Sequence, residues 1–291
     1  MSSGIVLIDK PVGITSHDAV YRLRKILGTK KVGHAGTLDP LASGLLVLGF
    51  NSGTRLLHFL VGATKQYTAS IRLGASTTTD DSAGEVIERH VVEKLSEAEV
   101  DNSIKKLTGK ISQTPSSVSA IKVDGKRAYD LVREGQEVEL KPRDVEVSRF
   151  VRTTPLRFEE GFVDFDVLVD CSSGTYIRAL ARDLGKDLGI GGHITALRRT
   201  KVANFEVESA NSLDSNEVKT LSLAKVAETV FSVISITTDQ CVDLVHGKRV
   251  LLSSNENQLA GIDPTGELLA ILESAGPGNY KSLAVFPKEQ K

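Results

Sequence analysis

The chain has 291 residues, of which 40% are hydrophobic and 25% charged, and its 36 Lys and Arg residues nearly balance its 37 Asp and Glu residues. This composition predicts a soluble globular protein of one long domain or two shorter ones, with no global positive field to attract a polyanion. The two cysteines, Cys171 and Cys241, lie far apart and have no histidine at metal-ligand spacing, which argues against a disulfide framework and against a zinc site.

Strand signals come first along the chain. Residues 5–8 are apolar, and Asp9-Lys10-Pro11 interrupts them too early for a signal peptide or a membrane span, so we expect a cytoplasmic protein. Further strands are predicted at 45–48 and 65–73. In the latter, apolar and polar residues alternate, and Tyr67 falls on the apolar face.

Two helix starts carry a capping-box pattern. Thr15 with Asp18 precedes one apolar run of helical spacing, and Ser96 with Glu99 precedes another. Both segments are therefore predicted to be amphipathic helices.

The clearest alternation covers residues 162–171, where Val163 to Cys171 put apolar side chains on one face and aspartates on the other. The turn-forming residues 172–174 follow, and the apolar spacing from Ile177 predicts a helix that ends near Gly189. Arg178 then lies in the first turn of that helix.

Strands and helices are interspersed irregularly, which favours an α+β fold with a mixed or antiparallel sheet over a doubly wound one. After about residue 231 the chain contains four short strand candidates, at 233–236, 258–263, 267–272 and 282–286. We therefore divide it into a larger domain, residues 1–231, and a small β-rich domain, residues 232–291.

Basic residues form two clusters. The first cluster occupies a stretch without acidic residues and consists of Arg22, Arg24, Lys25, Lys30 and Lys31. The second cluster surrounds the helix after the 172–174 turn and consists of Arg178, Arg182, Lys186, Arg198, Arg199 and Lys201. A single basic run usually marks a solvated face. Two runs flanking motif-like loops favour contact with a polyanion.

The loop 33–40 has an unusual composition, Gly-His-Ala-Gly-Thr-Leu-Asp-Pro. Its glycines permit positive φ or a close approach to a ligand, and Pro40 favours an extended Asp39. On these grounds alone Asp39 is either a nucleophile or base, or an ordinary turn residue.

The octapeptide closely resembles the catalytic loop of the TruB family of pseudouridine synthases, and further segments match that family in the same order. They are Ile8-Asp9-Lys10-Pro11, Lys65-Gln66-Tyr67, Ser119 to Lys122 with Gly125 to Tyr129, and Cys171 to Arg178. Ordered motifs over residues 4–207 are far more specific than any one of them.

The resemblance implies roles for four residues. Asp39 takes the place of the essential aspartate, Tyr67 lies against the target base, and Arg178 pairs with the aspartate. His34 inserts into the RNA loop when the uridine is flipped out of its stack.

Other positions are expected to bind RNA or line the pocket. The resemblance points to Lys10, Lys122, Tyr129 and Tyr176, and the first basic cluster adds Lys30 and Lys31 as phosphate contacts. The polar segment 74–84 resembles the family's loop beside the active site, where Asp80 or Asp81 contacts RNA or supporting groups, or simply forms a turn.

The family implies isomerisation of the T-loop uridine of tRNA, uridine 55 in tRNA numbering, with no cofactor and no metal; no phosphate-binding loop for ATP or NAD is present in the sequence. The expected partner is the T arm of tRNA, gripped partly by a PUA-like C-terminal domain. We expect a monomer without membrane contact or an obligatory protein partner. The alternatives are an RNA chaperone that acts without chemistry and a guide-RNA-dependent relative of the dyskerin type.

Overall fold

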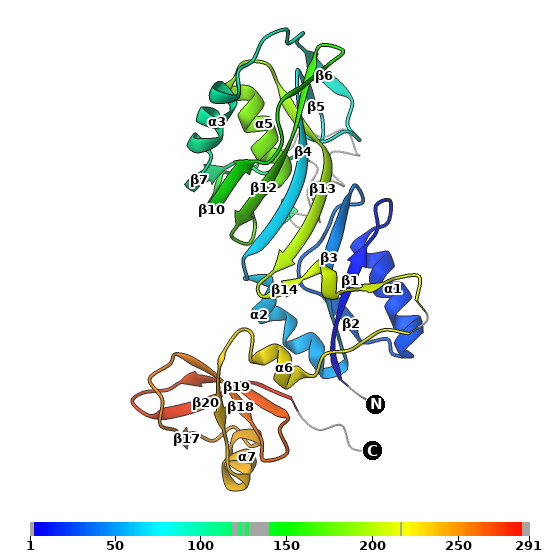
Figure 1. Cartoon of the computed structure of the whole chain (residues 1–291). Helices are drawn as coiled ribbons and strands as arrows, with labels where there is room; N and C mark the ends of the chain where they lie inside the picture. The colour runs from blue at the N-terminus through cyan, green and yellow to red at the C-terminus, as the bar shows by residue number, and fades with distance from the viewer. Residues whose placement is uncertain (1–2, 118–121, 124–125, 128–139, 216, 287–291) are drawn as a thin grey trace. The chain divides into compact units, whose positions relative to one another are not determined.

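The computed structural model of the chain describes residues 3–117, 122–123, 126–127, 140–215 and 217–286. It forms two compact units, one made of residues 64–201 and the other of residues 1–63 together with 202–291 (Figure 1). Each unit has its own helices.

The unit 64–201 is built on an antiparallel arrangement of long strands. Its strands follow the order β13 (Gly192–Val202), β4 (Lys65–Leu73), β12 (Phe162–Cys171), β10 (Arg143–Arg152) and β7 (Gly109–Gln113). The short β11 (Arg157–Glu159) pairs with the start of β12. β12 is antiparallel to both β4 and β10.

Strands β4 and β12 have the bounds that the sequence predicts. The alternate residues Val163, Phe165, Val167 and Val169 are completely buried, because one face of β12 lies on the core and the other carries aspartates. Tyr67 lies on the buried face of β4, as predicted from its alternation.

Helices α3 (Glu97–Lys106) and α5 (Ile177–Asp187) lie beside each other on this unit (Figure 1). Lys106 of α3 pairs with Asp187 of α5 at 2.8 Å. Gly185 permits close packing of α5, since a Cβ there would overlap the backbone of Gly191 and Gly192. The predicted capping box of Ser96 and Glu99 opens α3.

Two short hairpins complete this unit. β5 (Ala75–Thr77) pairs with β6 (Val86–Arg89), and β8 (Lys122–Val123) pairs with β9 (Lys126–Arg127).

In the other unit, neighbouring strands follow the order β15 (Asn211–Ser212), β1 (Gly4–Lys10) and β3 (Ala42–Phe50), while β2 (Val32–His34) also pairs with β3. β1 is antiparallel to β3 and parallel to β15. Helix α1 (Ser16–Leu27) begins at the predicted capping box of Thr15 and Asp18. The remaining short elements are η1 (Asn51–Arg55), α2 (Leu57–Val61), β14 (Phe205–Glu206), η2 (Val207–Ser209) and α6 (Leu223–Ala227).

The C-terminal part is the small β-rich domain that the sequence predicts. Its strands follow the order β16 (Ser232–Ser235), β18 (Gln258–Ile262), β19 (Leu268–Ser274), β20 (Asn279–Val285) and β17 (Val250–Leu251), with α7 (Thr238–Val245) packed on them. The other face of this sheet shares a core with the N-terminal residues: Ala260, Ile271 and Phe286 belong to one buried cluster with Leu45 and Leu60. The sheet is therefore packed into its unit.

Burial changes the interpretation of the second basic cluster. Arg178 is 4% exposed and Arg199 is 1% exposed, so these two charges do not form a solvated face. Arg199 lies on β13, a strand that the sequence analysis did not predict because its charges were assigned to the surface. Among the described residues, no helix is both long and apolar enough to span a membrane.

Candidate functional site

The loop that carries Asp39 is held by hydrogen bonds on both sides of that residue. The Ser16 hydroxyl accepts from the Leu38 N–H at 2.8 Å and donates to the Leu38 carbonyl at 3.1 Å. The Gly13 N–H donates to the Pro40 carbonyl at 2.8 Å. Gly36 has φ +93°, a conformation that glycine adopts without steric cost. The loop is therefore fixed just before and just after its half-buried aspartate.

His34 ends β2, four residues from that anchor. Its Cα partner is Leu48 of β3, and the next N–H, of Ala35, donates to the Val47 carbonyl at 2.9 Å. The histidine is half-buried. Because His34 ends a paired strand, the position of its Cα is fixed. This suits the insertion into the RNA loop that the resemblance implies.

Lys10 is completely buried at the end of β1. Its ammonium donates to the carbonyls of Pro11 and Ile14, each at 2.8 Å. These bonds tie β1 to the turn that precedes α1, the helix that supplies Ser16. Of the two roles suggested for Lys10, this position favours the pocket wall over a phosphate contact.

Tyr67 is buried on β4, opposite Val169 of β12. Lys65 shares this face of the strand two residues earlier and is 6% exposed. Burial, followed by the charge of Arg199, lowers the pKa of Lys65 to about 8. Burial also raises the pKa of the neighbouring Cys171 thiol to about 11.

Arg178 lies in the first turn of α5, as the apolar spacing predicts, and it is buried. Its Nη1 donates to the Thr79 carbonyl at 2.8 Å and lies 3.3 Å from Oδ2 of Asp81. The Asp81 side chain is in turn held by the Ala83 N–H at 3.0 Å and by the Thr79 hydroxyl at 2.5 Å. The turn 77–81 thus presents both a carbonyl and a carboxylate to the arginine.

Tyr176, two residues before Arg178, is also anchored. The Tyr176 side chain is half-exposed at the N-cap of α5, while its backbone exchanges two hydrogen bonds with the Gln113 amide, N–H to Oε1 at 2.9 Å and Nε2 to carbonyl at 3.1 Å. The end of β7 therefore fixes the entry to the helix that carries Arg178.

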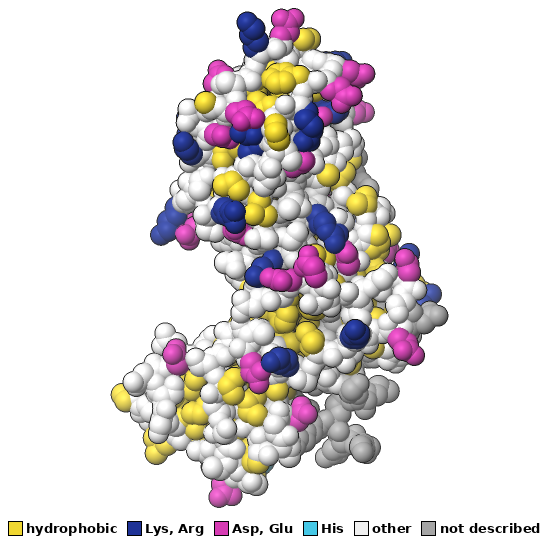
Figure 2. All heavy atoms as spheres, viewed as in Figure 1, with side chains coloured by type: hydrophobic (Ala, Val, Ile, Leu, Met, Phe, Trp, Pro, Cys, Tyr) yellow, Lys and Arg dark blue, Asp and Glu magenta, His cyan; other side chains and the backbone are white. Residues whose placement is uncertain are grey.

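Lys30 and Lys31 are exposed in the turn after α1. On α1 itself, Tyr21 is 57% exposed, and Nζ of Lys25 lies 4.6 Å from the centre of its ring. On the face drawn in Figure 2, basic and acidic side chains are interspersed.

The predicted residues fall on both units. Asp39, His34 and Lys10 belong to the unit 1–63 with 202–291, whereas Tyr67 and Arg178 belong to the unit 64–201. The pairing of Asp39 with Arg178 stays a prediction. The side chain of Lys122 and the whole of Tyr129 lie outside the described residues.

The sequence does not single out Ser16 as an anchor. Its only signal was a place inside the capping-box segment, and its partner Leu38 is 22 residues away. The sequence likewise gives no sign of which residues pair with Asp80 and Asp81, although it marks both aspartates as candidates for the site.

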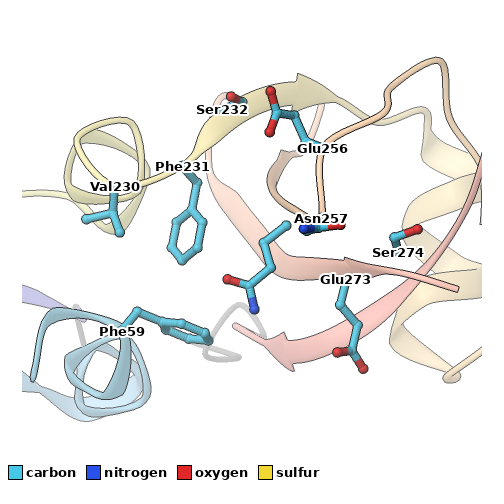
Figure 3. Close-up of a pocket in the computed structure, with 9 residues that line it drawn as sticks. Phe59, Val230, Phe231, Ser232, Glu256, Asn257, Glu273 and Ser274 are labelled. Carbon is cyan, nitrogen blue, oxygen red and sulfur yellow. The ribbon is translucent and has the colours of Figure 1, made fainter. Parts of the chain in front are cut away.

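A cavity of about 770 Å³ opens elsewhere in the unit that carries Asp39. Figure 3 shows Phe59 and Phe231 on one side of it and Asn257 and Glu273 on the other, and the two rings form an edge-to-face pair with centres 5.3 Å apart. None of the described residues that line it is Lys or Arg. This cavity is unsuited to a phosphate group.

Within the described part of the chain, no group of three or more His, Cys, Asp or Glu side chains is arranged to hold a metal ion. The chemistry that the described residues offer is that of a carboxylate, a phenol and paired guanidinium groups.

Several curated proteins resemble this chain along nearly its whole length. The tRNA pseudouridine synthase B of Leifsonia xyli subsp. xyli is 49% identical over 100% of this chain and 98% of its own. That of Rhodococcus jostii is 49% identical over 99% and 95%, and that of Thermobifida fusca is 47% identical over 98% and 99%.

Among solved structures, a Cbf5-Nop10-Gar1 complex contains a chain with a TM-score of 0.70 and 24% identity, covering 98% of this chain and 84% of that one. At this identity the likeness bears on the fold, which is the α+β fold with a small β-rich C-terminal domain.

Two family models match consecutive segments. The TruB family pseudouridylate synthase N-terminal domain matches residues 24–177, and the tRNA pseudouridylate synthase B C-terminal domain matches residues 178–235. The chain therefore belongs to the TruB family of tRNA pseudouridine synthases, which are isomerases.

Proposed function

We propose that this enzyme isomerises the T-loop uridine of tRNA, uridine 55 in tRNA numbering, with Asp39 as the catalytic residue. The observation that carries the proposal is the anchoring of the Asp39 loop by Ser16 and Gly13. A carboxylate whose backbone is fixed on both sides is preorganised for one direction of approach.

The reaction breaks the bond between N1 of uracil and C1′ of the ribose and forms a bond between C5 and C1′. The hydrogen at C5 leaves as a proton and N1 gains one, so no atoms are added and no electrons are transferred. Asp39 attacks the nucleotide or stabilises an electron-poor sugar, while Tyr67 offers a flat ring and a hydroxyl to the base. Arg178 orients the carboxylate through a charge-assisted pair.

The target base must leave its stack before this chemistry begins. His34 fills or braces the space that the base vacates, as the resemblance implies. The exposed Lys30 and Lys31 hold RNA phosphates, and the small C-terminal domain, residues 232–291, contacts the acceptor side of the T arm.

The test uses full-length tRNA labelled with tritium at C5 of uridine. Because C5 loses its hydrogen when it bonds to C1′, wild-type enzyme is expected to release one tritium per tRNA, and a uridine-to-cytidine change at position 55 is expected to abolish release. Asp39→Asn is expected to abolish release and to leave tRNA affinity within about a few-fold, because many backbone contacts supply affinity. An Asp39→Asn enzyme that releases tritium at the wild-type rate would remove Asp39 from the mechanism.

The same experiment separates the alternatives. A chaperone without chemistry would refold the T arm and release no tritium. A guide-dependent enzyme would need an added guide RNA, whereas relatives that are 46–49% identical over nearly the full chain are named tRNA pseudouridine synthase B.

A further inference from the structure

Two arginines on one face of α5 pair with two consecutive aspartates of the turn 77–81. Arg178 and Arg182 are four residues apart and therefore neighbours on the helix surface. Arg178 Nη1 lies 3.3 Å from Oδ2 of Asp81, and Arg182 Nη1 lies 3.0 Å from Oδ2 of Asp80. Both carboxylates are buried.

Arg182 connects three segments of its unit. Besides Asp80, its Nη2 donates to the Thr114 carbonyl at 2.7 Å, and its Nε donates to Asp183 within α5 at 2.9 Å. Three residues after Thr114, the Ser117 hydroxyl donates to the Thr78 carbonyl at 3.2 Å. The chain beyond β7, the turn 77–81 and α5 therefore meet at Arg182.

Asp80 has a backbone conformation that needs support. Its φ is +60°, in the left-handed region, where aspartate is tolerated at a cost that glycine does not bear. Its carbonyl accepts from the Ile194 N–H at 3.2 Å, and the following Ser82 N–H donates to the Ile194 carbonyl at 2.9 Å. This conformation turns the Thr79 carbonyl and the Asp81 carboxylate together toward Arg178.

A contribution to stability does not readily explain why the protein has the pair of Asp80 and Arg182. Burial raises the pKa of Asp80 in spite of the nearby charges of Arg182 and Arg178, so the fold holds this carboxylate at a cost. Buried ion pairs commonly stabilise a protein no more than apolar side chains of similar size would. Some of them instead select one conformation of the chain.

We propose that Asp80 and Arg182 are positioning residues that hold the turn 77–81 in the conformation that orients Arg178. Arg182 fixes Asp80, Asp80 fixes the backbone between Thr79 and Asp81, and these two residues fix the guanidinium. The inference rests on the proposed function, in which Arg178 orients the catalytic carboxylate.

The test compares Arg182→Met, Asp80→Asn and Asp80→Gly in the full-length enzyme. The readouts are tritium release in a single turnover at saturating tRNA, the dissociation constant for tRNA, and the melting temperature. Each variant is expected to lose about ten- to a hundred-fold in single-turnover rate, as for a small misplacement of a catalytic group, with affinity within about two-fold. Glycine relieves the left-handed strain and keeps the fold, so Asp80→Gly separates positioning from stability.

The matched control is Arg152→Met. Arg152 is also a largely buried arginine of this unit, and it pairs with Glu97 at 2.8 Å and Asp101 at 3.1 Å on α3, away from the turn 77–81. This control is expected to lower the melting temperature without changing the single-turnover rate. The double variant Asp80→Asn with Arg182→Met is expected to be no slower than the worse single variant, because both changes break one connection.

The outcomes distinguish this inference from the proposed function. If wild type releases no tritium, the proposed function fails. If wild type is active while a folded Asp80→Gly or Arg182→Met enzyme reacts at the wild-type rate, the positioning role is wrong. A loss of rate in Arg152→Met equal to that in Arg182→Met would also overturn it, since the effect would then follow general destabilisation.

Discussion

Ser16 and Leu38 exchange two hydrogen bonds across 22 residues of chain, with the hydroxyl of the first residue of α1 accepting the Leu38 N–H and donating to the Leu38 carbonyl. Both residues are buried, so no solvent replaces either bond when one partner is lost. The start of a helix thereby fixes the residue directly before Asp39.

Ser16→Ala is expected to reduce the single-turnover rate about ten-fold or more, because the Asp39 loop loses its anchor while tRNA contacts remain. The unpaired Leu38 N–H is expected to cost ~1–3 kcal/mol of stability. Ser103→Ala is the control: Ser103 and Ser16 are each 2% exposed, and the Ser103 hydroxyl donates to Asp187 at 2.6 Å. Equal rates for the two variants would show that the anchor does not matter for chemistry.

These contacts mark where sequence patterns stop being informative. β12 was predicted with its bounds because its strict alternation reflects one buried face, and the starts of α1 and α3 were predicted because capping is local. β13 was missed because a strand carrying Arg198, Arg199 and Lys201 resembles a surface charge cluster.

The candidate site also contains residues that the sequence predicts and contacts that it does not. Asp39, Tyr67 and Arg178 are candidates because of family motifs, and residue spacing alone would not have identified them. Arg178 pairs with Asp81 over 97 residues, and Arg182 pairs with Asp80 over 102. Such partners are set by the packing of α5 on the turn 77–81, which leaves no periodic signal.

Lys65 is expected to titrate near pH 8. Its pKa is lowered by burial from the ordinary value of 10.5 to about 8, and the unfolded chain retains the ordinary value. Between these two values the unfolded chain binds a proton that the folded protein has released, so the contribution of Lys65 to stability rises with pH across this window and is constant on either side.

The measurement is a pH titration of the Lys65 side-chain signals by NMR, assigned with Lys65→Met. Denaturant unfolding at several pH values between about 7 and 11 is expected to show the rise in wild type relative to Lys65→Met. Arg199→Gln is expected to raise the midpoint, because it removes a neighbouring positive charge. A midpoint near 10.5 in the folded protein would contradict the burial of a charged Lys65.

Charge reversal at Lys30 and Lys31 is expected to weaken tRNA binding without changing which uridine is modified, because phosphate contacts carry no sequence information. The plot of log affinity against log salt is expected to become shallower by roughly one for each lost contact. Lys225→Glu on α6 is the control, since its side chain is 71% exposed but lies outside the basic stretch. A salt dependence in Lys30→Glu identical to that of wild type would exclude Lys30 from the interface.

An isolated T-arm stem-loop is expected to be a substrate. Because the proposed roles of Asp39, His34 and Tyr67 all concern the target uridine and its loop, the proposed chemistry needs only the RNA loop. RNA recognition favours shaped loops and splayed bases over duplex sequence. Exchanging stem base pairs should therefore preserve single-turnover tritium release, whereas loop changes that prevent the T-loop fold should abolish it even with the target uridine retained.

The small C-terminal domain is expected to add affinity for full-length tRNA rather than rate. Because its sheet shares a core with residues such as Leu45, this is better measured with surface variants, Lys248→Glu and Lys281→Glu, than by deletion. These variants should weaken binding of full-length tRNA and leave the stem-loop reaction unchanged. A stem-loop that stays unreacted at saturating concentration, with full-length tRNA converted normally, would mean that recognition outside the T arm is required for the chemical step.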